Sequence, residues 1–201
     1  TSAFVVSSTG NVVIAEVSKN IGPRSVVFLD SRLFLDSRYV ARVVDMLTLS
    51  NIKRFDDVIG AIKKYTGISD IRIVRDEVPY ARVEGAGYLP LSALGDGVRS
   101  AILYAFSLAF GDVIIMEEPE VHMHAKLMDM LIHLIATSQQ QYFISTHSSD
   151  FVHKALALAD NLNKLSDIRV IRLRNCKVVD VLAGRDARFM LEERGRDIHE
   201  V

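Results

Sequence analysis

Two short apolar runs, each followed by a segment with helical periodicity, constrain the fold of this chain more than any other feature. Residues 113–116 (VIIM) precede a predicted helix at about residues 122–137, and residues 142–145 (YFIS) precede another at about residues 150–159. Strands that are apolar on both sides are typical of a parallel sheet covered by helices on both faces. The sequence therefore predicts an α/β fold with a central, mainly parallel sheet.

The remaining segments predict antiparallel strands near both ends of the chain. Residues 3–6 and 12–17 flank a good turn sequence and predict a hairpin, and residues 168–173 and 177–182 predict a second, closing hairpin. Further strands are expected at residues 25–29, 71–74 and 80–83, the last two separated at Pro79, and helices at residues 37–49, 55–65 and 98–110. We interpret residues 1–201 as a single domain that ends in a charged tail at residues 185–201, either a short helix or disordered.

Composition excludes several classes of protein. The 24 basic and 25 acidic side chains give a net charge of −1, so no overall charge favours wholesale binding to nucleic acid or membranes. No apolar run is long enough to span a membrane. The single cysteine, Cys176, excludes an internal disulfide and no secretory signal is visible, so we expect a cytoplasmic location.

Two carboxylates stand where the first apolar run ends, in the segment DVIIMEEPEVHMH (residues 112–124). Parallel sheets bind ligands at the carboxyl ends of their strands, so Glu117 and Glu118 suggest a site for Mg²⁺ and phosphate. One carboxylate would hold the hydrated cation and the next would orient the attacking water. A surface turn that caps the following helix is an equally good interpretation of this segment taken alone.

Two further segments have the composition of ligand-binding loops. His147 follows the second apolar run in YFISTHSSD (residues 142–150), where an imidazole could contact a γ-phosphate or its attacking water. In LPLSALGDGVRS (residues 89–100), Gly95 and Gly97 can adopt backbone angles that other residues avoid, and they precede a helix whose N-terminal amides form an anion site. Alone, either segment is better explained by an ordinary structural role.

Together, in this order and within about 60 residues, the three segments resemble the C-terminal half of ATP-binding-cassette ATPases. The closest branch is the AAA-type, overcoming-lysogenization-defect-like and SMC-like group. The resemblance extends over about residues 25–182 and is sharpest at residues 89–151. It implies a three-layer fold like that of P-loop NTPases, and ATP hydrolysis with Mg²⁺ in a homodimer that sandwiches the nucleotide.

The resemblance also implies roles for particular residues. Glu118 matches the catalytic glutamate, His147 matches the switch histidine, and Glu117 takes the place of the Walker B aspartate, which holds Mg²⁺ indirectly. The signature loop, which reaches the nucleotide of the partner subunit, corresponds to Ser92, Gly95, Asp96 and Gly97.

The chain departs from the family pattern at three places. Gly95 replaces a serine that donates to the γ-phosphate, and Glu117 is one methylene longer than aspartate. No Gly-x-x-x-x-Gly-Lys-Ser/Thr and no Q-loop glutamine occur in the sequence. Because the chain begins at Thr1, we expect that an upstream strand and P-loop are missing, and that this chain alone binds ATP weakly and does not hydrolyse it measurably.

Other interpretations remain open. A degenerate half-domain that dimerises or binds a partner without nucleotide is the main alternative. A DNA- or nuclease-linked partner is a further possibility, although no nuclease domain is visible in the sequence. A zinc site at Glu118, His122, His124 and His153 fits no known ligand spacing, so we interpret His122 and His124 as helix-face residues.

Overall fold

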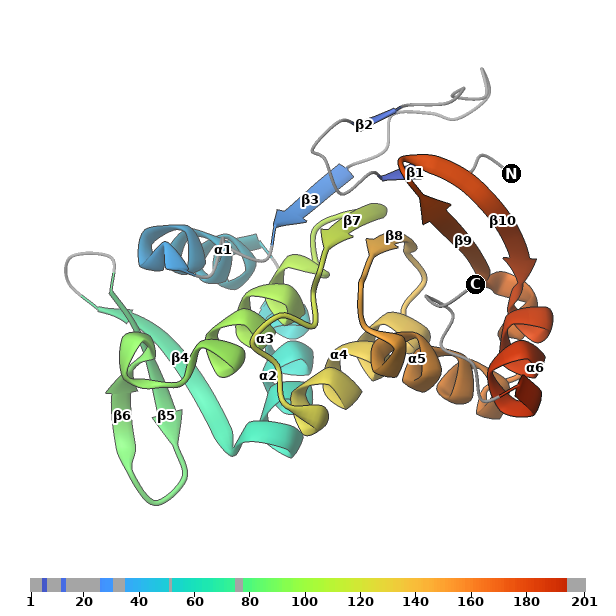
Figure 1. Ribbon diagram of the computed structural model, residues 1–201. Helices are drawn as coiled ribbons and strands as arrows, with labels where there is room; N and C mark the ends of the chain where they lie inside the picture. Colours follow the sequence, from blue (N-terminus) through green and yellow to red (C-terminus); the bar gives the residue numbers. More distant parts are fainter. Residues whose placement is uncertain are drawn as a thin grey trace. The chain divides into compact units, whose positions relative to one another are not determined.

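The computed structural model describes residues 5–6, 12–13, 26–30, 35–50, 52–74 and 78–194 (Figure 1). Contacts along the chain divide it into two compact units, one formed by Arg24–Tyr142 and the other by Thr1–Pro23 with Phe143–Val201. The single-domain interpretation therefore stays a prediction.

A parallel pair of strands forms the sheet that carries the candidate site. β3 (Val26–Asp30) pairs with β7 (Val113–Glu117) in parallel, with Asp30 opposite Glu117 at the last position. β8 (Gln141–Ser145) follows in the order β3-β7-β8, and its Gln141 N–H donates a 3.0 Å hydrogen bond to the Asp112 carbonyl. This confirms the predicted α/β fold with a parallel sheet, because the apolar runs at residues 25–29 and 113–116 are the strands that pair.

Four helices of the unit Arg24–Tyr142 share one apolar core: α1 (Ser37–Ser50), α2 (Ile52–Thr66), α3 (Asp96–Ser107) and α4 (Ala125–Thr137). In α2, Phe55, Ile59 and Ile62 recur at the spacing of one helix face and are all buried. The Phe55 ring packs on Phe106 of α3 with centroids 5.4 Å apart. α2 ends at Gly67, whose φ of +74° and hydrogen bond to the Lys63 carbonyl are typical of a helix C-terminus.

An antiparallel sheet joins α2 to α3. It consists of β4 (Ile68–Val74), β5 (Val78–Val83) and β6 (Gly87–Pro90), in that order. The sequence predicted two strands separated at Pro79, but Pro79 lies inside β5 opposite Ile73. The missing N–H is tolerated because β6 pairs only with residues 80–83, so no strand lies beside Pro79 on that side.

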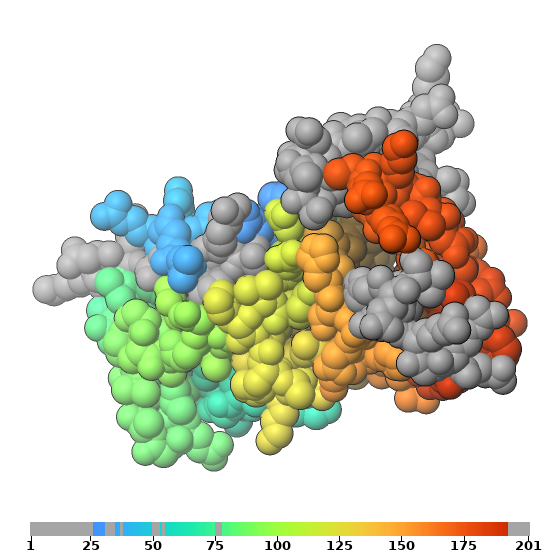
Figure 2. Space-filling model, viewed as in Figure 1, coloured from blue at the N-terminus to red at the C-terminus, as the bar shows by residue number. Residues whose placement is uncertain are grey.

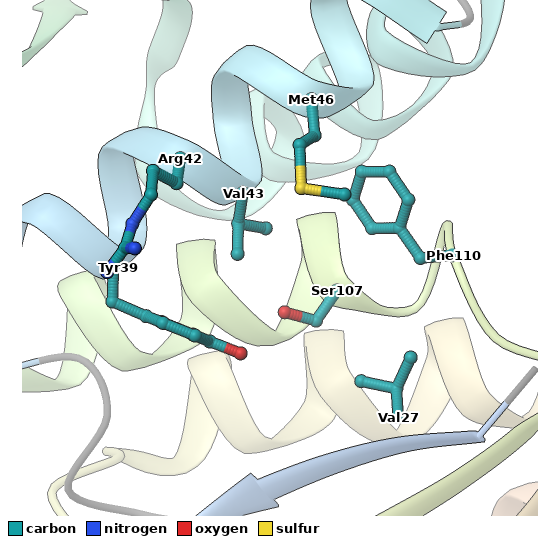
Figure 3. A pocket seen from close by; sticks show the side chains of 7 residues that line it. All are labelled: Val27, Tyr39, Arg42, Val43, Met46, Ser107 and Phe110. Atoms are coloured by element: carbon teal, nitrogen blue, oxygen red, sulfur yellow. The ribbon is translucent and has the colours of Figure 1, made fainter.

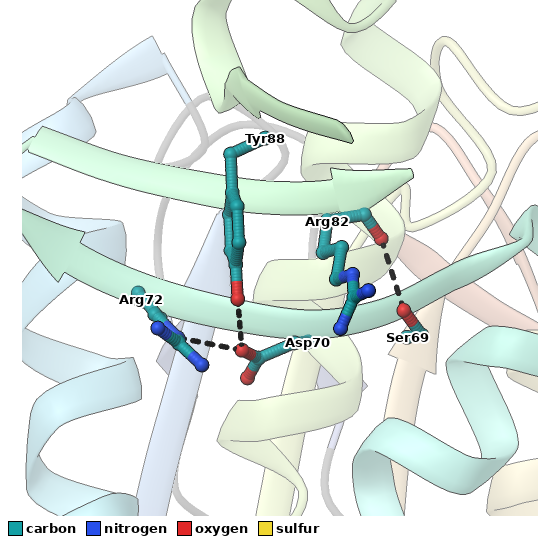
Figure 4. A network of polar contacts seen from close by, with 5 residues as sticks. All are labelled: Ser69, Asp70, Arg72, Arg82 and Tyr88. Atoms are coloured by element: carbon teal, nitrogen blue, oxygen red, sulfur yellow. Dashed lines mark hydrogen bonds and ion pairs between the residues drawn. The ribbon is translucent and has the colours of Figure 1, made fainter. Parts of the chain in front are cut away.

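Figure 2 shows this sheet in green at the molecular surface. A hydrogen-bonded network lies on its outer face. Asp70 accepts hydrogen bonds from the Tyr88 hydroxyl (2.6 Å) and from Arg72 Nε (2.7 Å), and the Arg72 guanidinium lies 5.0 Å from the centre of the Tyr88 ring (Figure 4). Burial alone would raise the pKa of Asp70, but the hydrogen bonds from Tyr88 and Arg72 outweigh it and hold that pKa below its usual value.

The other unit combines hairpins with two helices. β1 (Val5–Val6) pairs with β2 (Val12–Val13), and β9 (Arg169–Arg174) pairs with β10 (Lys177–Ala183), both antiparallel. The turn between β9 and β10 has positive φ at Asn175 (+50°) and Cys176 (+58°), the pattern of a two-residue hairpin turn. Both predicted hairpins are therefore confirmed where the structure describes them, and residues 3–4, 14–17 and 25 of the predicted strands lie outside the described residues.

Helices α5 (Ser149–Asn161) and α6 (Gly184–Arg194) complete this unit. A small core between them holds Leu156, Ala159, Leu165, Ala187 and Leu191. The predicted charged tail is thus helical up to Arg194, and residues 195–201 lie outside the described residues. Among the described residues, no helix has the length and apolar character needed to cross a membrane.

Candidate functional site

The loop after β7 holds Glu118 in an unusual backbone conformation. Glu117 is the last residue of β7, and Glu118 follows it with a φ of +45°, while His122, four residues later, has a φ of +66°. Both angles lie in the left-handed region, which costs a non-glycine residue about 1–3 kcal/mol. A tight turn maintains this shape, because the Glu118 carbonyl accepts the Val121 N–H at 3.1 Å. Such strain is typical of functional sites.

The predicted helix around His122 and His124 begins later than expected. α4 starts at Ala125, His124 is its N-terminal cap residue, and His122 lies in the preceding turn. Their interpretation as helix-face residues is therefore wrong. Because His122 occupies the left-handed region, the chain cannot extend the helix back to residue 122.

A second carboxylate lies beside Glu117. Asp30 ends β3 directly opposite Glu117 in the parallel register, so both side chains stand at the carboxyl edge of the sheet where ligands bind. The sequence analysis did not single out Asp30. Its signal was available, because the run VVFLD ends in an acid as VIIME does.

The predicted signature loop leads directly into α3. Ser92 lies in a short 3-10 turn, Leu91–Ala93. Gly95 is the N-terminal cap residue of α3, and its carbonyl accepts the N–H groups of Val98 (2.9 Å) and Arg99 (3.2 Å). Gly95 has a φ of −59° and ψ of 152°, which other residues also adopt. The expectation that this glycine serves special backbone angles is wrong.

Gly97 is required for a different reason. It lies in the first turn of α3, and a Cβ there would overlap the backbone carbonyl of His122 and come within 3.4 Å of Leu127 Cδ1. Only glycine lets the two segments approach so closely. The first turn of α3 is therefore packed directly against the loop that carries Glu118.

Asp96 lies in the same first turn. Its carboxylate is half exposed and pairs with Arg99 Nη1 at 3.2 Å. An acid at this position suits the positive end of the helix dipole. The structure thus brings Asp96 and Gly97 together with the Glu118 loop within one unit.

A buried phenol lies close to the acids at the edge of the sheet. Tyr104 of α3 is 1% exposed. Burial raises the pKa of its hydroxyl far above the usual value, the nearby Ser100 hydroxyl lowers it, and the negative charges of Asp30, Glu120 and Glu117 raise it again. Neither the Tyr104 nor the Ser100 hydroxyl oxygen has a partner at hydrogen-bonding geometry. At neutral pH Tyr104 therefore keeps its proton.

The arrangement fits a divalent cation shared with a phosphate ligand. Mg²⁺ is commonly held by one or two carboxylates together with waters and phosphate oxygens. Asp30 and Glu117 supply two such carboxylates, which stand opposite each other at the end of the paired strands. Across the described residues, no group of three or more His, Cys, Asp or Glu side chains gathers to hold a metal by itself.

His147 occupies a fixed turn in the other unit. It follows β8 and is exposed. The residues on either side of it are fixed by hydrogen bonds: the Thr146 hydroxyl accepts the Ser148 N–H at 3.0 Å. The Ser148 hydroxyl caps α5 by accepting the Phe151 N–H at 3.1 Å. Glu117 and Glu118 belong to the unit Arg24–Tyr142. The convergence of His147 with Glu118 stays a prediction.

Comparison with known proteins decides the family. A family model described as the AAA ATPase domain matches residues 41–152, which is more than half of the 201 residues. The chain belongs to the AAA ATPase domain family. The matched range includes the predicted signature loop, Glu117, Glu118 and His147, and membership supports a general ATPase function with a nucleotide substrate.

This ATPase domain is similar in fold to a solved structure of low sequence identity. A structure from a study of ATP-driven dimerization and DNA-stimulated activation of SMC ATPases is 19% identical, covers 76% of this chain and 96% of its own, and has a TM-score of 0.52. A metal-chelate type ABC transporter in an inward-facing conformation is 14% identical, covers 84% and 63%, and has a TM-score of 0.47. A search of curated protein sequences found no match. The predicted AAA-type ATPase domain is confirmed by the family match, and the structure from the SMC ATPase study agrees with the predicted fold.

Proposed function

We propose that this chain carries the hydrolysis residues of an ATPase that works as a nucleotide-sandwich dimer. Glu118 acts as the general base or orients the attacking water, Glu117 holds the magnesium ion through its water shell, and His147 contacts the γ-phosphate. Ser92, Gly95, Asp96 and Gly97 face the nucleotide bound to the partner subunit. The observation that carries this proposal is the left-handed Glu118, which a tight turn holds directly after the last residue of β7.

Phosphoryl transfer to water demands little covalent chemistry from a protein. Its transition state is reached by positioning the water in line with the leaving oxygen and by neutralising charge on the phosphates. Mg²⁺, when bound, supplies part of that neutralisation. A carboxylate fixed on a strained loop, as at Glu118, loses little conformational freedom when it orients the water.

The grip on the nucleotide must come from a P-loop, which this sequence does not contain. We propose that the 201-residue chain alone binds ATP weakly and turns over no measurable ATP, and that hydrolysis requires a segment with a Gly-x-x-x-x-Gly-Lys-Ser/Thr motif. The lysine and backbone amides of that motif hold the β- and γ-phosphates, which Glu117 and Glu118 cannot hold by charge.

ATP turnover tests the assignment. The test compares the 201-residue chain with the same chain extended upstream through a P-loop segment. We expect phosphate release only from the extended protein, and expect Glu118→Gln to abolish it while ATP binding persists. Glu84→Gln, in the exposed turn between β5 and β6, is the matched control and should keep full activity. Turnover by the 201-residue chain that Glu118→Gln abolishes would overturn the proposed dependence on a P-loop.

The dimer has its own test. The similar SMC ATPase comes from a study of ATP-driven dimerization, which supports the same behaviour here. In the extended protein carrying Glu118→Gln, ATP should convert monomers to dimers in analytical ultracentrifugation, because trapped ATP holds the interface closed. Gly95→Trp should prevent this, since the open space around its Cβ position lets the chain fold while the bulky ring blocks the approach of the partner. Dimers of equal stability with and without ATP would contradict the sandwich.

A non-catalytic half-domain is the second candidate, and the absence of a P-loop from these 201 residues favours it. Glu118 and His147 oppose it, because such a module has no chemical need for them. The coding sequence upstream of Thr1 separates the two, since a P-loop motif there supports the ATPase. Stimulation of turnover by added DNA would support a DNA-linked partner. We also propose a cytoplasmic location, which the single cysteine, Cys176, supports because it cannot form a disulfide within the chain.

A further inference from the structure

One face of α3 carries three buried hydroxyl groups without partners. Ser100, Tyr104 and Ser107 are 1–2% exposed, and none of their side-chain oxygens has a partner at hydrogen-bonding geometry, although the Ser100 hydroxyl lies near enough to Tyr104 to lower its pKa. Their spacing of four and three residues places them on one side of the helix. Buried hydroxyls are almost always hydrogen-bonded. A row of buried hydroxyls without partners therefore suggests an acceptor that is present only in some states of the protein or that changes orientation.

This face of α3 looks toward the parallel sheet. Ser107, at the end of the helix, lines a cavity of about 350 Å³ together with Val27 of β3 and residues of α1 (Figure 3). Gly97, at its start, touches the turn that follows β7. α3 therefore runs with its N-terminus at the edge of the sheet where Asp30 and Glu117 end the two strands.

The direction of the Tyr104 side chain follows from helix geometry. Side chains in an α-helix lean toward its N-terminus, so the hydroxyl at the end of a tyrosine lies on the N-terminal side of its own Cα. The Tyr104 hydroxyl is thus carried toward the edge at which the strands end. The electrostatic surroundings of the hydroxyl agree with this direction, because the negative charges that raise its pKa belong to Asp30, Glu120 and Glu117.

We propose that Tyr104 is a positioning residue: its hydroxyl, which has no partner in this structure, donates a hydrogen bond to the Asp30–Glu117 carboxylate pair when a divalent cation binds, and so orients the pair for the ion. Two carboxylates side by side repel each other, and a cation between them removes that repulsion. A donor fixed on a packed helix holds one carboxylate while the other turns to the ion. Hydrogen bonds of this kind behind a metal-binding carboxylate commonly change metal affinity by about 10–100-fold.

This inference rests on the proposed magnesium role of Glu117 and goes beyond it by adding two residues, Asp30 and Tyr104. It also explains why a tyrosine rather than phenylalanine stands in the core of α3. Phenylalanine would fill the same space without burying an unpartnered hydroxyl.

The test measures binding of Mn²⁺ to the purified 201-residue chain by electron paramagnetic resonance of the free ion, so no ATP turnover is needed. We expect Tyr104→Phe to weaken Mn²⁺ binding about 10-fold, and expect Asp30→Asn and Glu117→Gln to weaken it at least as much. Tyr88→Phe is the matched control, because it also removes a tyrosine hydroxyl near a carboxylate, at Asp70, and should leave Mn²⁺ affinity unchanged.

The outcomes separate the two proposals. If Glu117→Gln weakens binding and Tyr104→Phe does not, the role of Tyr104 is overturned while the proposed function stands. If Glu117→Gln has no effect on Mn²⁺ binding, both fail. If the wild-type chain shows no saturable Mn²⁺ binding, the role of Tyr104 fails alone, because the proposed function has the cation held together with a phosphate ligand. Tyrosine-sensitised emission of bound Tb³⁺ gives a second readout on a protein with Tyr104 intact. It should persist in Tyr88→Phe and disappear in Glu117→Gln, and emission that persists in Glu117→Gln would show that the ion does not bind at the Asp30–Glu117 pair.

Discussion

Substituting Gly97 by alanine places a methyl group where the first turn of α3 meets the loop after Glu118. The new Cβ would overlap the His122 carbonyl oxygen, which is backbone and cannot rotate away as a side chain can. His122 already has a φ of +66°, so the loop has little freedom to retreat. Either α3 shifts or the turn at residues 118–122 opens.

The size of the effect follows from two opposing contributions. Overpacking by one methyl group costs about 1–3 kcal/mol, whereas alanine in a helix recovers about 0.5–1 kcal/mol relative to glycine. Because the overlap is with backbone, the cost lies in the upper half of its range. The net loss is then about 1–2.5 kcal/mol, which for a chain of this length lowers Tm by about 2–10 °C.

Gly95→Ala is the matched control, because no heavy atom lies within 4 Å of its Cβ position and its φ is −59°. Thermal unfolding followed by circular dichroism compares the two variants with the wild-type chain. Gly95→Ala should stay within about 0.5 kcal/mol of wild type. The reasoning is refuted if Gly97→Ala is as stable as wild type, or if Gly95→Ala is the more destabilised of the two.

Two further predictions concern other contacts. Ser148→Ala removes the hydroxyl that accepts the Phe151 N–H at the start of α5. It should lower the free energy of unfolding by about 1 kcal/mol, measured by urea unfolding. Aspartate also caps helices, so a Ser148→Asp variant that is equally destabilised would contradict this prediction. Asp70 has a lowered pKa in the folded state, so its stabilising contribution is complete above about pH 4 and is lost as pH falls through the folded pKa. Between pH 6 and pH 2 the free energy of unfolding of the wild-type chain should therefore fall by about 0.2–1 kcal/mol more than that of Asp70→Asn. Equal falls in the two proteins would disprove the linkage.

The elements with strong periodicity could be predicted from the sequence. β3 and β7 were identified because continuous apolar runs favour buried strands, and α2 because its apolar residues recur at helical spacing. β6 (GYLP) was not predicted, since four residues with glycine and proline at the ends have no alternation to detect. Its pairing depends on the glycine turn before it, where Gly85 and Gly87 both have φ of +79°.

The candidate site was predictable only in part. Glu117 and Glu118 follow a recognisable strand, and the structure places them as expected at its end. Asp30 was missed because its role depends on which strands are neighbours, and the register of β3 with β7 is a long-range property. Tyr104 was missed because an aromatic residue in an apolar helix is ordinarily part of the core, and only the nearby carboxylates set it apart.

A single helix connects all the parts of the site in the unit Arg24–Tyr142. The predicted signature loop ends at the cap of α3, the first turn of α3 touches the Glu118 loop through Gly97, and Tyr104 of the same helix lies among the acids at the edge of the sheet. Packed helices move as rigid bodies because interiors are dense. In the proposed dimer, contact of the signature loop with a partner's nucleotide would therefore displace Glu118 and the Asp30–Glu117 pair together, which links closure of one ATP site to the chemistry of the other.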